Sequence, residues 1–443
     1  MTTSDRLTAA SMADAMAMAG PRPRAAGRHH IQATTMATMG ALITAPSRRP
    51  GPLKTFSMIA TLHYLTLLSA VSFVNPSSVS ATPPPNAGLH VSGGLINGGN
   101  TCYLNAQLQC AYHIPRVRGM VIDPPSVSKN SAASSPALAS LGYVFAAMQK
   151  AADSGLDGGY EYAPSTPTTV LCRTLGIAAW EQQDSQEFWK LLLPEFKLPQ
   201  LVDLYQGSYE GYIAAIDGSG RERKREEQFL DLSLDVSGGS VSTALEDTFC
   251  KPELLSEKEG NGWRPEKGAD KVDALKGSLL KANGLPPILQ LHLLRFQYDW
   301  QTDTMSKINS RFRFPKVLDL SNICSGIEKD EEARVVYELQ SVVVHVGEYG
   351  SGHYYAYVRP DARKNTWYRF DDDKVTEVTY REVAADCYGG RSSRIAAQEA
   401  KEGFFAKLFR GSGGKYGWGG RSSSAYVLQY VRRESIPMLY DDA

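Results

Sequence analysis

The fold of this 443-residue chain is decided by the stretch Gly94-Leu95-Ile96-Asn97-Gly98-Gly99-Asn100-Thr101-Cys102-Tyr103-Leu104-Asn105-Ala106-Gln107-Leu108-Gln109, which sets a cysteine behind a glycine-rich turn. Asn100 or Thr101 can cap a helix that we expect from about Cys102 to His113, and Pro115 prevents its continuation. Free N–H groups and the positive helix end stabilise a thiolate, the form of cysteine that attacks. The stretch therefore predicts a nucleophile at Cys102.

A cysteine nucleophile needs a base and a third group that orients the base, and without them a lone cysteine is more often a small buried hydrophobe. Residues 352–359 and 366–370 alternate and are rich in aromatic and β-branched side chains, which predicts two strands. The residues between them have turn composition. An antiparallel hairpin centred near residues 362 and 363 would place His353 opposite Asp371 or Asp372.

Both stretches resemble motifs of the ubiquitin-specific proteases, a family of papain-like deubiquitinases. The first matches the cysteine box, Gly-Leu-x-Asn-x-Gly-x-Thr-Cys-Tyr-x-Asn, at every fixed position. The second is similar to the histidine box, Gly-His-Tyr-x-x-Tyr followed after a turn by Trp-Tyr-x-Phe-Asp-Asp. The resemblance implies that Cys102 is the nucleophile, His353 the general base and Asp371 its orienting carboxylate. Asp372 and Asp373 follow directly, so the choice among the three carboxylates is open.

The attacked carbonyl becomes an oxyanion, which needs hydrogen-bond donors placed where the charge develops. Asn97 lies five residues before Cys102, where the family uses an asparagine side chain. The resemblance therefore implies that Asn97 and the backbone N–H of Cys102 stabilise the oxyanion. The alternative is an ordinary turn asparagine.

Residues 180–193 resemble the family's Gln-x-Asp-x-x-Glu-Phe box, and their apolar positions recur at helical spacing up to Pro194. The resemblance implies that Asp184 meets the basic C-terminal tail of ubiquitin, whereas a solvated acidic helix face is the alternative. A tail that carries arginines and ends in two glycines requires acidic side chains and a narrow slot. Tyr354 and Tyr355 would suit such a slot and are predicted to bind substrate.

The likeness covers about 340 residues, as expected for one large domain rather than several modules. It implies an α+β, papain-like cysteine protease fold with thumb, palm and fingers subdomains. Strands are expected at 286–296, 307–315 and 425–432. The six cysteines include no Cys-x-x-Cys pair, so the chain resembles the subfamily whose fingers lack zinc, and we expect no metal and no cofactor. Scattered cysteines fit a reducing compartment, the cytoplasm or nucleus.

The predicted function is a cysteine-type deubiquitinase that hydrolyses the thioester, peptide or isopeptide bond at the C-terminal glycine of ubiquitin. Its expected partners are ubiquitin and ubiquitinated proteins. Two alternatives are a protease for another ubiquitin-like modifier and a silent ubiquitin-binding module, which would predict loss of a triad member. Basic and acidic residues number 47 each, so nothing in the charge argues for nucleic acid as a partner.

The resemblance leaves the N-terminus and one later segment unexplained. We divide the chain into a disordered basic leader (1–55), a hydrophobic segment (56–74), a linker (75–90) and the catalytic domain (91–435) with an insertion at 389–423. The hydrophobic segment just reaches the length of a membrane span. It could be a signal or anchor helix, an internal targeting signal or part of an inert leader, so membrane or organelle targeting is one of the predictions.

Overall fold

The computed structural model describes residues 91–125, 135–157, 165–178, 181–325, 334–390 and 423–441. The predictions for 1–55, 56–74 and 75–90, and for nearly all of the insertion, lie outside the described residues. Contacts divide the chain into the units 1–81 and 82–443, and every described residue belongs to the second. Among the described residues, no helix combines the length and the apolar character needed to cross a membrane.

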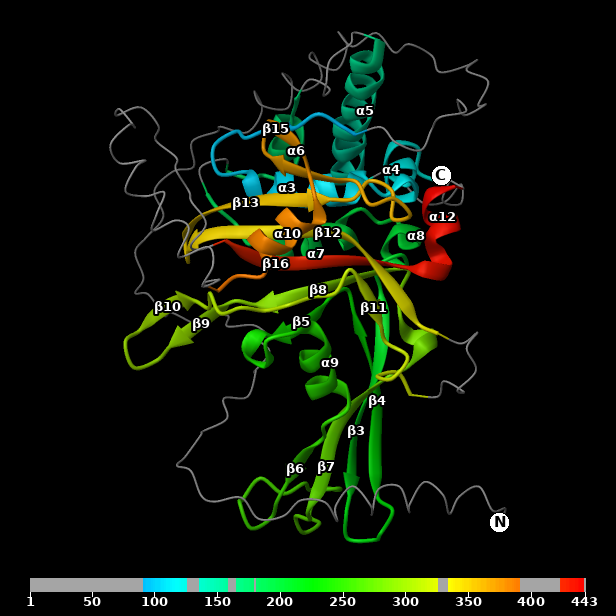
Figure 1. Ribbon diagram of the computed structural model, residues 1–443. Helices are drawn as coiled ribbons and strands as arrows, with labels where there is room; N and C mark the ends of the chain where they lie inside the picture. The colour runs from blue at the N-terminus through cyan, green and yellow to red at the C-terminus, as the bar shows by residue number, and fades with distance from the viewer. Residues whose placement is uncertain are drawn as a thin grey trace, which may run out of the picture. The chain divides into compact units, whose positions relative to one another are not determined.

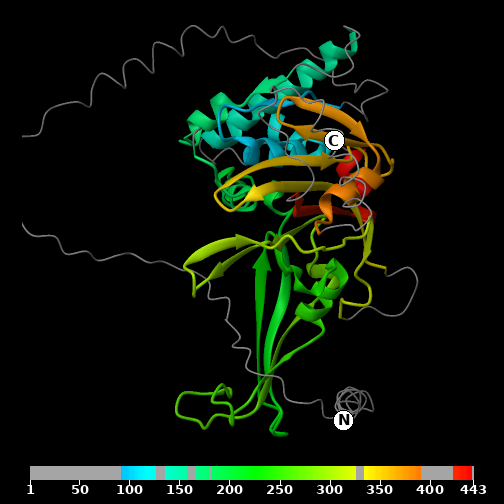
Figure 2. The same cartoon turned by 60° about the vertical axis from the view of Figure 1, so that its left-hand side comes forward.

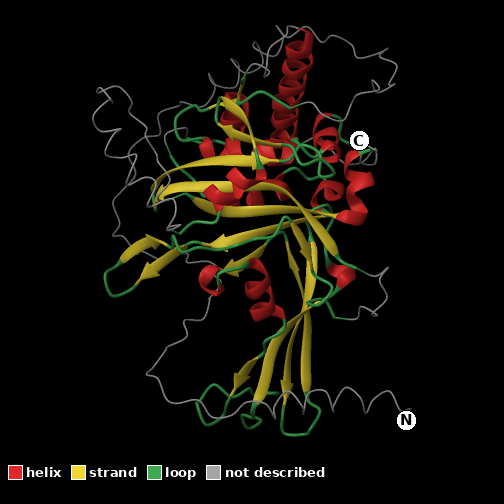
Figure 3. Ribbon diagram, in the orientation of Figure 1, coloured by secondary structure: helices red, strands yellow, loops and turns green. Residues whose placement is uncertain are grey.

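An eight-stranded sheet forms the centre of the described domain, in the order β15-β14-β13-β12-β16-β8-β5 with β11 also paired to β12 (Figures 1 and 3). All neighbouring strands are antiparallel except β5 and β8. Strand β12 is buried along nearly its whole length because both faces of the sheet are covered. The strands are β5 (Leu232–Asp235), β8 (Ile288–Leu294), β11 (Val317–Asp319), β12 (Val336–Glu348), β13 (Ser351–Val358), β14 (Trp367–Asp371), β15 (Lys374–Val378) and β16 (Ser424–Arg432).

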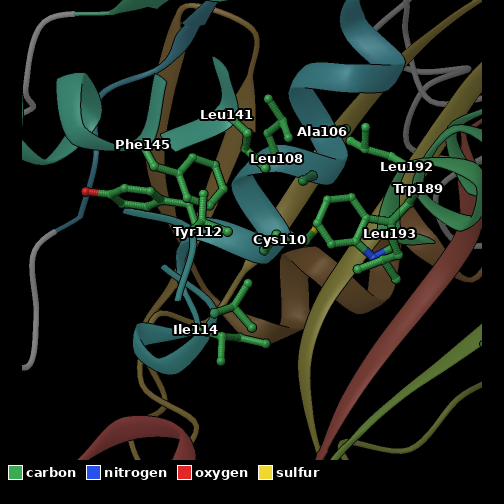
Figure 4. Close-up of a cluster of buried hydrophobic side chains, with 14 of the residues drawn as sticks. Ala106, Leu108, Cys110, Tyr112, Ile114, Leu141, Phe145, Trp189, Leu192 and Leu193 are labelled. Atoms are coloured by element: carbon green, nitrogen blue, oxygen red, sulfur yellow. The ribbon is translucent and has the colours of Figure 1, made fainter. Parts of the chain in front are cut away.

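A layer of helices covers one face of this sheet (Figure 1). Helix α3 is buried at every position because it lies between β13 and the other helices, α7 among them. Figure 4 shows the resulting core, in which Tyr112 of α3 packs against Phe145 and Cys110 of α3 lies beside Trp189. Burying one such large apolar side chain adds about 1.5–3 kcal/mol to the free energy of unfolding. The helices are α3 (Cys102–Tyr112), α4 (Pro115–Ile122), α5 (Pro136–Asp157), α6 (Thr169–Thr174), α7 (Ser185–Glu195), α8 (Pro199–Val202) and α12 (Ile436–Tyr440).

The last helix, α12, extends the domain beyond its predicted end at residue 435. It contacts α4, and Leu439 and Tyr440 are buried in the same core as α3. Residues 436–441 therefore belong to the folded domain, and the boundary predicted at 435 lies before its last helix.

A second core lies on the other face of the sheet and includes α9 (Val241–Phe249) and α10 (Tyr380–Cys387). Because successive strand residues point to opposite faces, Tyr354 of β13 joins the core of α3 whereas Tyr355 joins the second core. Both faces are apolar, so burial alone does not distinguish them in the sequence. Short 3₁₀ turns follow β5 (Val236–Gly238), β7 (Ala282–Gly284) and β16 (Arg433–Ser435).

A four-stranded antiparallel sheet in the order β4-β3-β7-β6 projects from the end of the large sheet (Figures 1 and 2). A separate hairpin, β9–β10, projects from the other end of β8. The strands are β3 (Gly207–Ala215), β4 (Glu222–Phe229), β6 (Glu253–Leu255), β7 (Ala274–Leu280), β9 (Phe296–Asp299) and β10 (Thr304–Lys307). Two short parallel strands, β1 (Leu95–Ile96) and β2 (Thr166–Pro167), complete the fold.

The strand predicted at 307–315 is wrong, because the ladder ends at Lys307. Beyond that residue the backbone is held by other groups. The buried guanidinium of Arg295 binds the carbonyl oxygens of Ile308 and Ser310 at 3.0 and 2.8 Å, and the N–H of Phe312 donates to Tyr388. These bonds satisfy backbone N–H and C=O groups of the segment that follows Lys307, although it pairs with no neighbouring strand in a ladder.

Candidate active site

The cysteine loop lies against the turn that follows β14. The N–H of Leu95 donates to the carbonyl oxygen of Asp372 at 2.8 Å. Gly94 has no room for a side chain, since a Cβ there would lie 2.4 Å from the same oxygen. The first glycine of the motif thus permits the close approach that brings the carboxylates after β14 to the start of α3.

The start of α3 differs from the prediction in how it is capped. Thr101 is the N-cap residue, but its side chain makes no capping bond. Its hydroxyl instead accepts the N–H of Gly98 at 3.1 Å, and its backbone N–H donates to the Asn97 side chain at 3.1 Å. Cys102 follows as the first helical residue, where the helix dipole favours a negative charge.

His353 and Asp371 lie on adjacent strands of the predicted hairpin. Ala356 pairs with Phe370, so the hairpin is centred one half-residue beyond the expected point. His353 and Asp371 are therefore diagonal neighbours on one face, and Nε2 of His353 lies 2.6 Å from Oδ1 of Asp371. Asp372 is further away, at 3.9 Å. Of the three carboxylates left open, Asp371 is the one bonded to the imidazole.

The charges in this group favour an imidazolium. Burial disfavours it, but the hydrogen bonds of the ring to Asp371 and Cys102 prevail and raise the pKa of His353 to about 10. Burial likewise opposes ionisation of Asp371, yet the bond to His353 and the charge of Arg369 hold the pKa of Asp371 below its ordinary value. Because Nε2 is bound to Asp371, Nδ1 is the ring nitrogen left for Cys102. The arrangement suits a thiolate–imidazolium pair.

Asn97 lies at the centre of a second group of hydrogen bonds. Its Nδ2 donates to Asp372 Oδ2 at 2.9 Å, and its Oδ1 accepts the N–H groups of Gly99 and Thr101. An amide nitrogen carries two N–H groups, and the bond to Asp372 uses one. Asn105 donates to the other oxygen of Asp372 at 2.9 Å. Sequence reasoning assigned no role to Asn105, although it is the last fixed position of the cysteine box.

Gln182 is a further residue that sequence reasoning missed. Its Nε2 donates to the carbonyl oxygen of Gly352 at 2.9 Å and lies 3.9 Å from the sulfur of Cys102. The N–H of Gly352 donates back to Gln182 at 3.3 Å. A Cβ on Gly352 would lie 2.3 Å from His345 Nε2, so this glycine permits close packing beside the thiol. The signal for Gln182 was its fixed place two residues before Asp184.

Asp184 caps helix α7. Its Oδ1 accepts the N–H groups of Gln186 and Glu187 at 2.8 and 3.2 Å, and its Oδ2 accepts the hydroxyl of Tyr426. The ring of Tyr354 lies 5.8 Å from that of Tyr426, and Tyr354 is only 4% exposed. Tyr354 therefore lies behind Asp184 and supports it rather than presenting a surface of its own.

The assignment of Tyr355 to a substrate slot is corrected by its position. Tyr355 is 4% exposed, belongs to the core on the α10 face, and donates its hydroxyl to Asp386. Its side chain has no free surface to offer to a substrate. The alternation of β13 sends Tyr355 away from the helix layer that Tyr354 faces.

All six cysteines are free thiols. Within the described residues, the one group of side chains that could hold a metal is His353, Asp371 and Asp372. The hydrogen bonds of these three to one another and to Asn97 and Asn105 account for their proximity. The expectation of zinc-free fingers and no cofactor stays a prediction.

A thiol at a helix N-terminus, with an imidazole and a carboxylate from a later hairpin, defines a papain-like cysteine hydrolase with an α+β fold. Comparison with protein families identifies the particular kind. The model of the ubiquitin carboxyl-terminal hydrolase family matches residues 93–430. The chain belongs to this family.

Individual relatives agree with the family match. Ubiquitin C-terminal hydrolase 13 of Arabidopsis thaliana is 35% identical over 353 residues, 76% of this chain and 29% of the relative. Ubiquitin carboxyl-terminal hydrolase 15 of Schizosaccharomyces pombe is 32% identical, over 77% of this chain and 28% of the relative. Ubiquitin carboxyl-terminal hydrolase 7 of Drosophila melanogaster is 28% identical, over 79% of this chain and 28% of the relative. The chain thus spans less than a third of the length of these curated relatives.

Proposed function

We propose that this chain is a cysteine-type deubiquitinase, which hydrolyses the thioester, peptide or isopeptide bond at the C-terminal glycine of ubiquitin. The observation that carries the proposal is the meeting of Cys102, His353 and Asp371, which come from a helix start and two strands far along the chain. Family membership supports the substrate class, since the relatives are named ubiquitin hydrolases.

The proposed reaction uses these groups in two steps. The Cys102 thiolate attacks the carbonyl carbon of ubiquitin's last glycine, and the backbone N–H of Cys102 and the remaining N–H of Asn97 stabilise the oxyanion. His353, oriented by Asp371, gives its proton to the leaving amine, and a thioester remains on the sulfur. A water that loses its proton to His353 then attacks the thioester and releases ubiquitin.

The remaining parts would hold the substrate. We assign the helix layer as the thumb, the eight-stranded sheet as the palm and the projecting four-stranded sheet as zinc-free fingers that contact the globular part of ubiquitin. Asp184 would meet the basic tail, with Tyr354 and Tyr426 behind it. Gln182 would border the path of the terminal glycines, because it lies beside the sulfur of Cys102 and the backbone of Gly352.

The proposed cellular location rests on the sequence. Free, scattered cysteines support the cytoplasm or nucleus. The hydrophobic segment 56–74 would add membrane or organelle association. A fluorescent fusion of residues 1–90 in cells tests this: diffuse fluorescence refutes a targeting role for the segment.

A ubiquitin probe with an electrophilic C-terminus tests the function and separates its alternatives. We expect a covalent adduct on Cys102, found by mass spectrometry, and no adduct for Cys102→Ser, which should still bind ubiquitin. Turnover in Cys102→Ser should fall by at least about 10⁴-fold. Binding without labelling of the wild type would favour a silent binding module. Reaction only with the probe of another modifier would favour the other protease.

A further inference from the structure

The face of the sheet that carries the His353–Asp371 pair also carries an arginine. His353, Tyr355 and Tyr357 alternate along β13, and Arg369 and Asp371 alternate along β14. Tyr357 pairs directly with Arg369, so these five side chains share one face, the face covered by α10. The catalytic imidazole is thus the end of a continuous row of polar and aromatic side chains.

Arg369 holds the oxygen of Asp371 that His353 does not use. Its guanidinium lies 2.7 Å from Oδ2, whereas Oδ1 is bonded to His353 at 2.6 Å. Asp371 is the last residue of β14 and its side chain is 27% exposed, so strand pairing alone leaves its carboxylate free to rotate. Two bonds to two different oxygens fix the plane of the carboxylate.

Arg369 is itself held in place. Its guanidinium lies over the ring of Tyr355 with 4.2 Å to the ring centre, a cation–π contact. The hydroxyl of Tyr355 donates to Asp386 of α10, which also accepts the hydroxyls of Tyr357 at 2.9 Å and Ser423 at 2.7 Å. A carboxylate with three hydroxyl donors is a rigid anchor, so the ring beneath Arg369 has little freedom.

We propose that Arg369 is a positioning residue of the active site, which locks the Asp371 carboxylate toward His353 and is supported from below by Tyr355 and Asp386. The substrate on which this role would act is taken from the proposed function. The contacts of Arg369 do not depend on that function. It also gives Tyr355 a role different from substrate contact: Tyr355 supports the charge that orients the triad.

The test compares Arg369→Gln, Arg369→Lys and the control Arg363→Gln. Arg363 lies at the turn of the same hairpin and also binds carboxylates, those of Asp361 and Asp441, but none of the triad. Kinetics on a fluorogenic C-terminal amide of ubiquitin give kcat and KM, and thermal unfolding reports folding. A misplacement of about 1 Å can cost about 100-fold, so we expect Arg369→Gln to lower kcat about 10-fold while KM changes less than about 2-fold.

Arg369→Lys keeps a positive charge near Asp371 but loses the planar guanidinium that stacks on Tyr355, so its kcat should lie between that of Arg369→Gln and that of the wild type. Arg363→Gln should leave kcat unchanged. The proposal is overturned if Arg369→Gln keeps kcat within about 2-fold, if Arg363→Gln loses as much, or if Arg369→Lys is no better than Arg369→Gln.

A second measurement separates this inference from the proposed function. The rate at which iodoacetamide alkylates Cys102, followed by mass spectrometry, depends on the thiolate–imidazolium pair and not on ubiquitin. We expect Arg369→Gln to slow alkylation several-fold relative to the wild type and Arg363→Gln. If the wild type fails to hydrolyse ubiquitin but this difference appears, the proposed function fails and the positioning role stands. Equal alkylation rates overturn the positioning role.

Two substitutions of Tyr355 test the support beneath the guanidinium. Tyr355→Phe keeps the ring and loses the bond to Asp386, whereas Tyr355→Leu loses the ring. We expect Tyr355→Leu to approach the kcat of Arg369→Gln and Tyr355→Phe to lie between it and the wild type. If both variants keep wild-type kcat, the supporting role of Tyr355 is wrong.

Discussion

The catalytic end of the large sheet and the projecting four-stranded sheet are built from different contacts. At the catalytic end, partly buried side chains bind one another in a connected group, as in the bonds from His353 to Asp371 and from Asn97 to Asp372. On the projecting sheet, ion pairs such as Lys224 with Glu222 join side chains that are about half exposed. Partly buried networks set geometry, whereas exposed pairs add little stability.

Three glycines differ in what their missing side chains allow. Gly94 at the catalytic end has backbone atoms within 2.6 Å of where a Cβ would lie. Gly218 and Gly220, between β3 and β4, have open space around them and positive φ angles, so they serve only the turn. Gly94 therefore marks a close backbone approach beside the reacting atoms, whereas Gly218 and Gly220 mark an open turn. Substitutions at the catalytic end should therefore change kcat, and those on the projecting sheet should change it little.

After loss of the nucleophile itself, the largest effect is expected for Asp371→Asn, which removes the charge that faces His353. An amide favours the wrong tautomer of the imidazole, and kcat should fall about 10³–10⁴-fold. The pKa of His353 should also fall from about 10, so the alkaline limb of the kcat/KM profile should move to lower pH. An alkaline limb that stays in place would contradict the bond seen here.

The same substitution has a consequence for stability. A histidine whose folded pKa is raised stabilises the fold fully below its unfolded pKa of about 6.5 and loses this contribution as pH rises through about 10. The free energy of unfolding of the wild type should therefore decline between these values more than that of Asp371→Asn. Urea unfolding at both ends of this range measures the difference, and parallel declines would refute the pairing.

The next largest fall in kcat is expected for Gly94→Ala. A Cβ at Gly94 would meet the carbonyl of Asp372, so the cysteine loop must shift from the carboxylates, lowering kcat about 100-fold. The overpacking should cost about 1–3 kcal/mol. Gly119→Ala in α4 is the control, because nothing lies within 4 Å of its Cβ position, and it should stabilise the fold by about 0.5–1 kcal/mol. Equal effects on kcat would show that the close approach is not needed.

A smaller effect is expected at Asp184, where capping and charge can be separated. Asp184→Ala loses both, whereas Asp184→Asn keeps a good N-cap and removes the charge. If the charge meets the basic tail, Asp184→Asn should raise KM about 10-fold with kcat nearly unchanged. Asp184→Ala should do the same and lose about 1 kcal/mol of stability as well. An unchanged KM in Asp184→Asn would leave only the capping role.

Much of the catalytic end could be predicted because its signals are local. The helix expected from Cys102 to His113 is confirmed as Cys102–Tyr112, and the hairpin that carries His353 is confirmed with its centre shifted by half a residue. Turn composition and strand alternation act over a few residues, and the β13–β14 turn fixes which residues meet. The bond between His353 and Asp371 follows from that register.

The rest could not be predicted because it depends on what covers each surface. β13 is buried on both faces, so its alternation gives no polar pattern that separates Tyr354 from Tyr355. The role of Asn105 depends on a bond to Asp372, in a turn far along the chain, and the role of Arg369 depends on the ring of Tyr355 on the neighbouring strand. The side chain of Thr101 does not cap the helix, and its hydroxyl accepts the N–H of Gly98 instead.

The smallest effect is expected for Lys281→Gln on the projecting sheet, which is matched to Arg369→Gln. Each substitution neutralises a cation of one ion pair, at 2.8 Å to Glu210 and at 2.7 Å to Asp371. The Lys281 side chain is 48% exposed, and such a pair contributes about 0.2–1 kcal/mol. Lys281→Gln should therefore leave kcat within about 1.5-fold and shift the free energy of unfolding by less than about 1 kcal/mol. Steady-state kinetics and urea unfolding of the two variants side by side measure this. If Lys281→Gln lowered kcat as much as Arg369→Gln, distance from the reacting atoms would not be what separates the two regions.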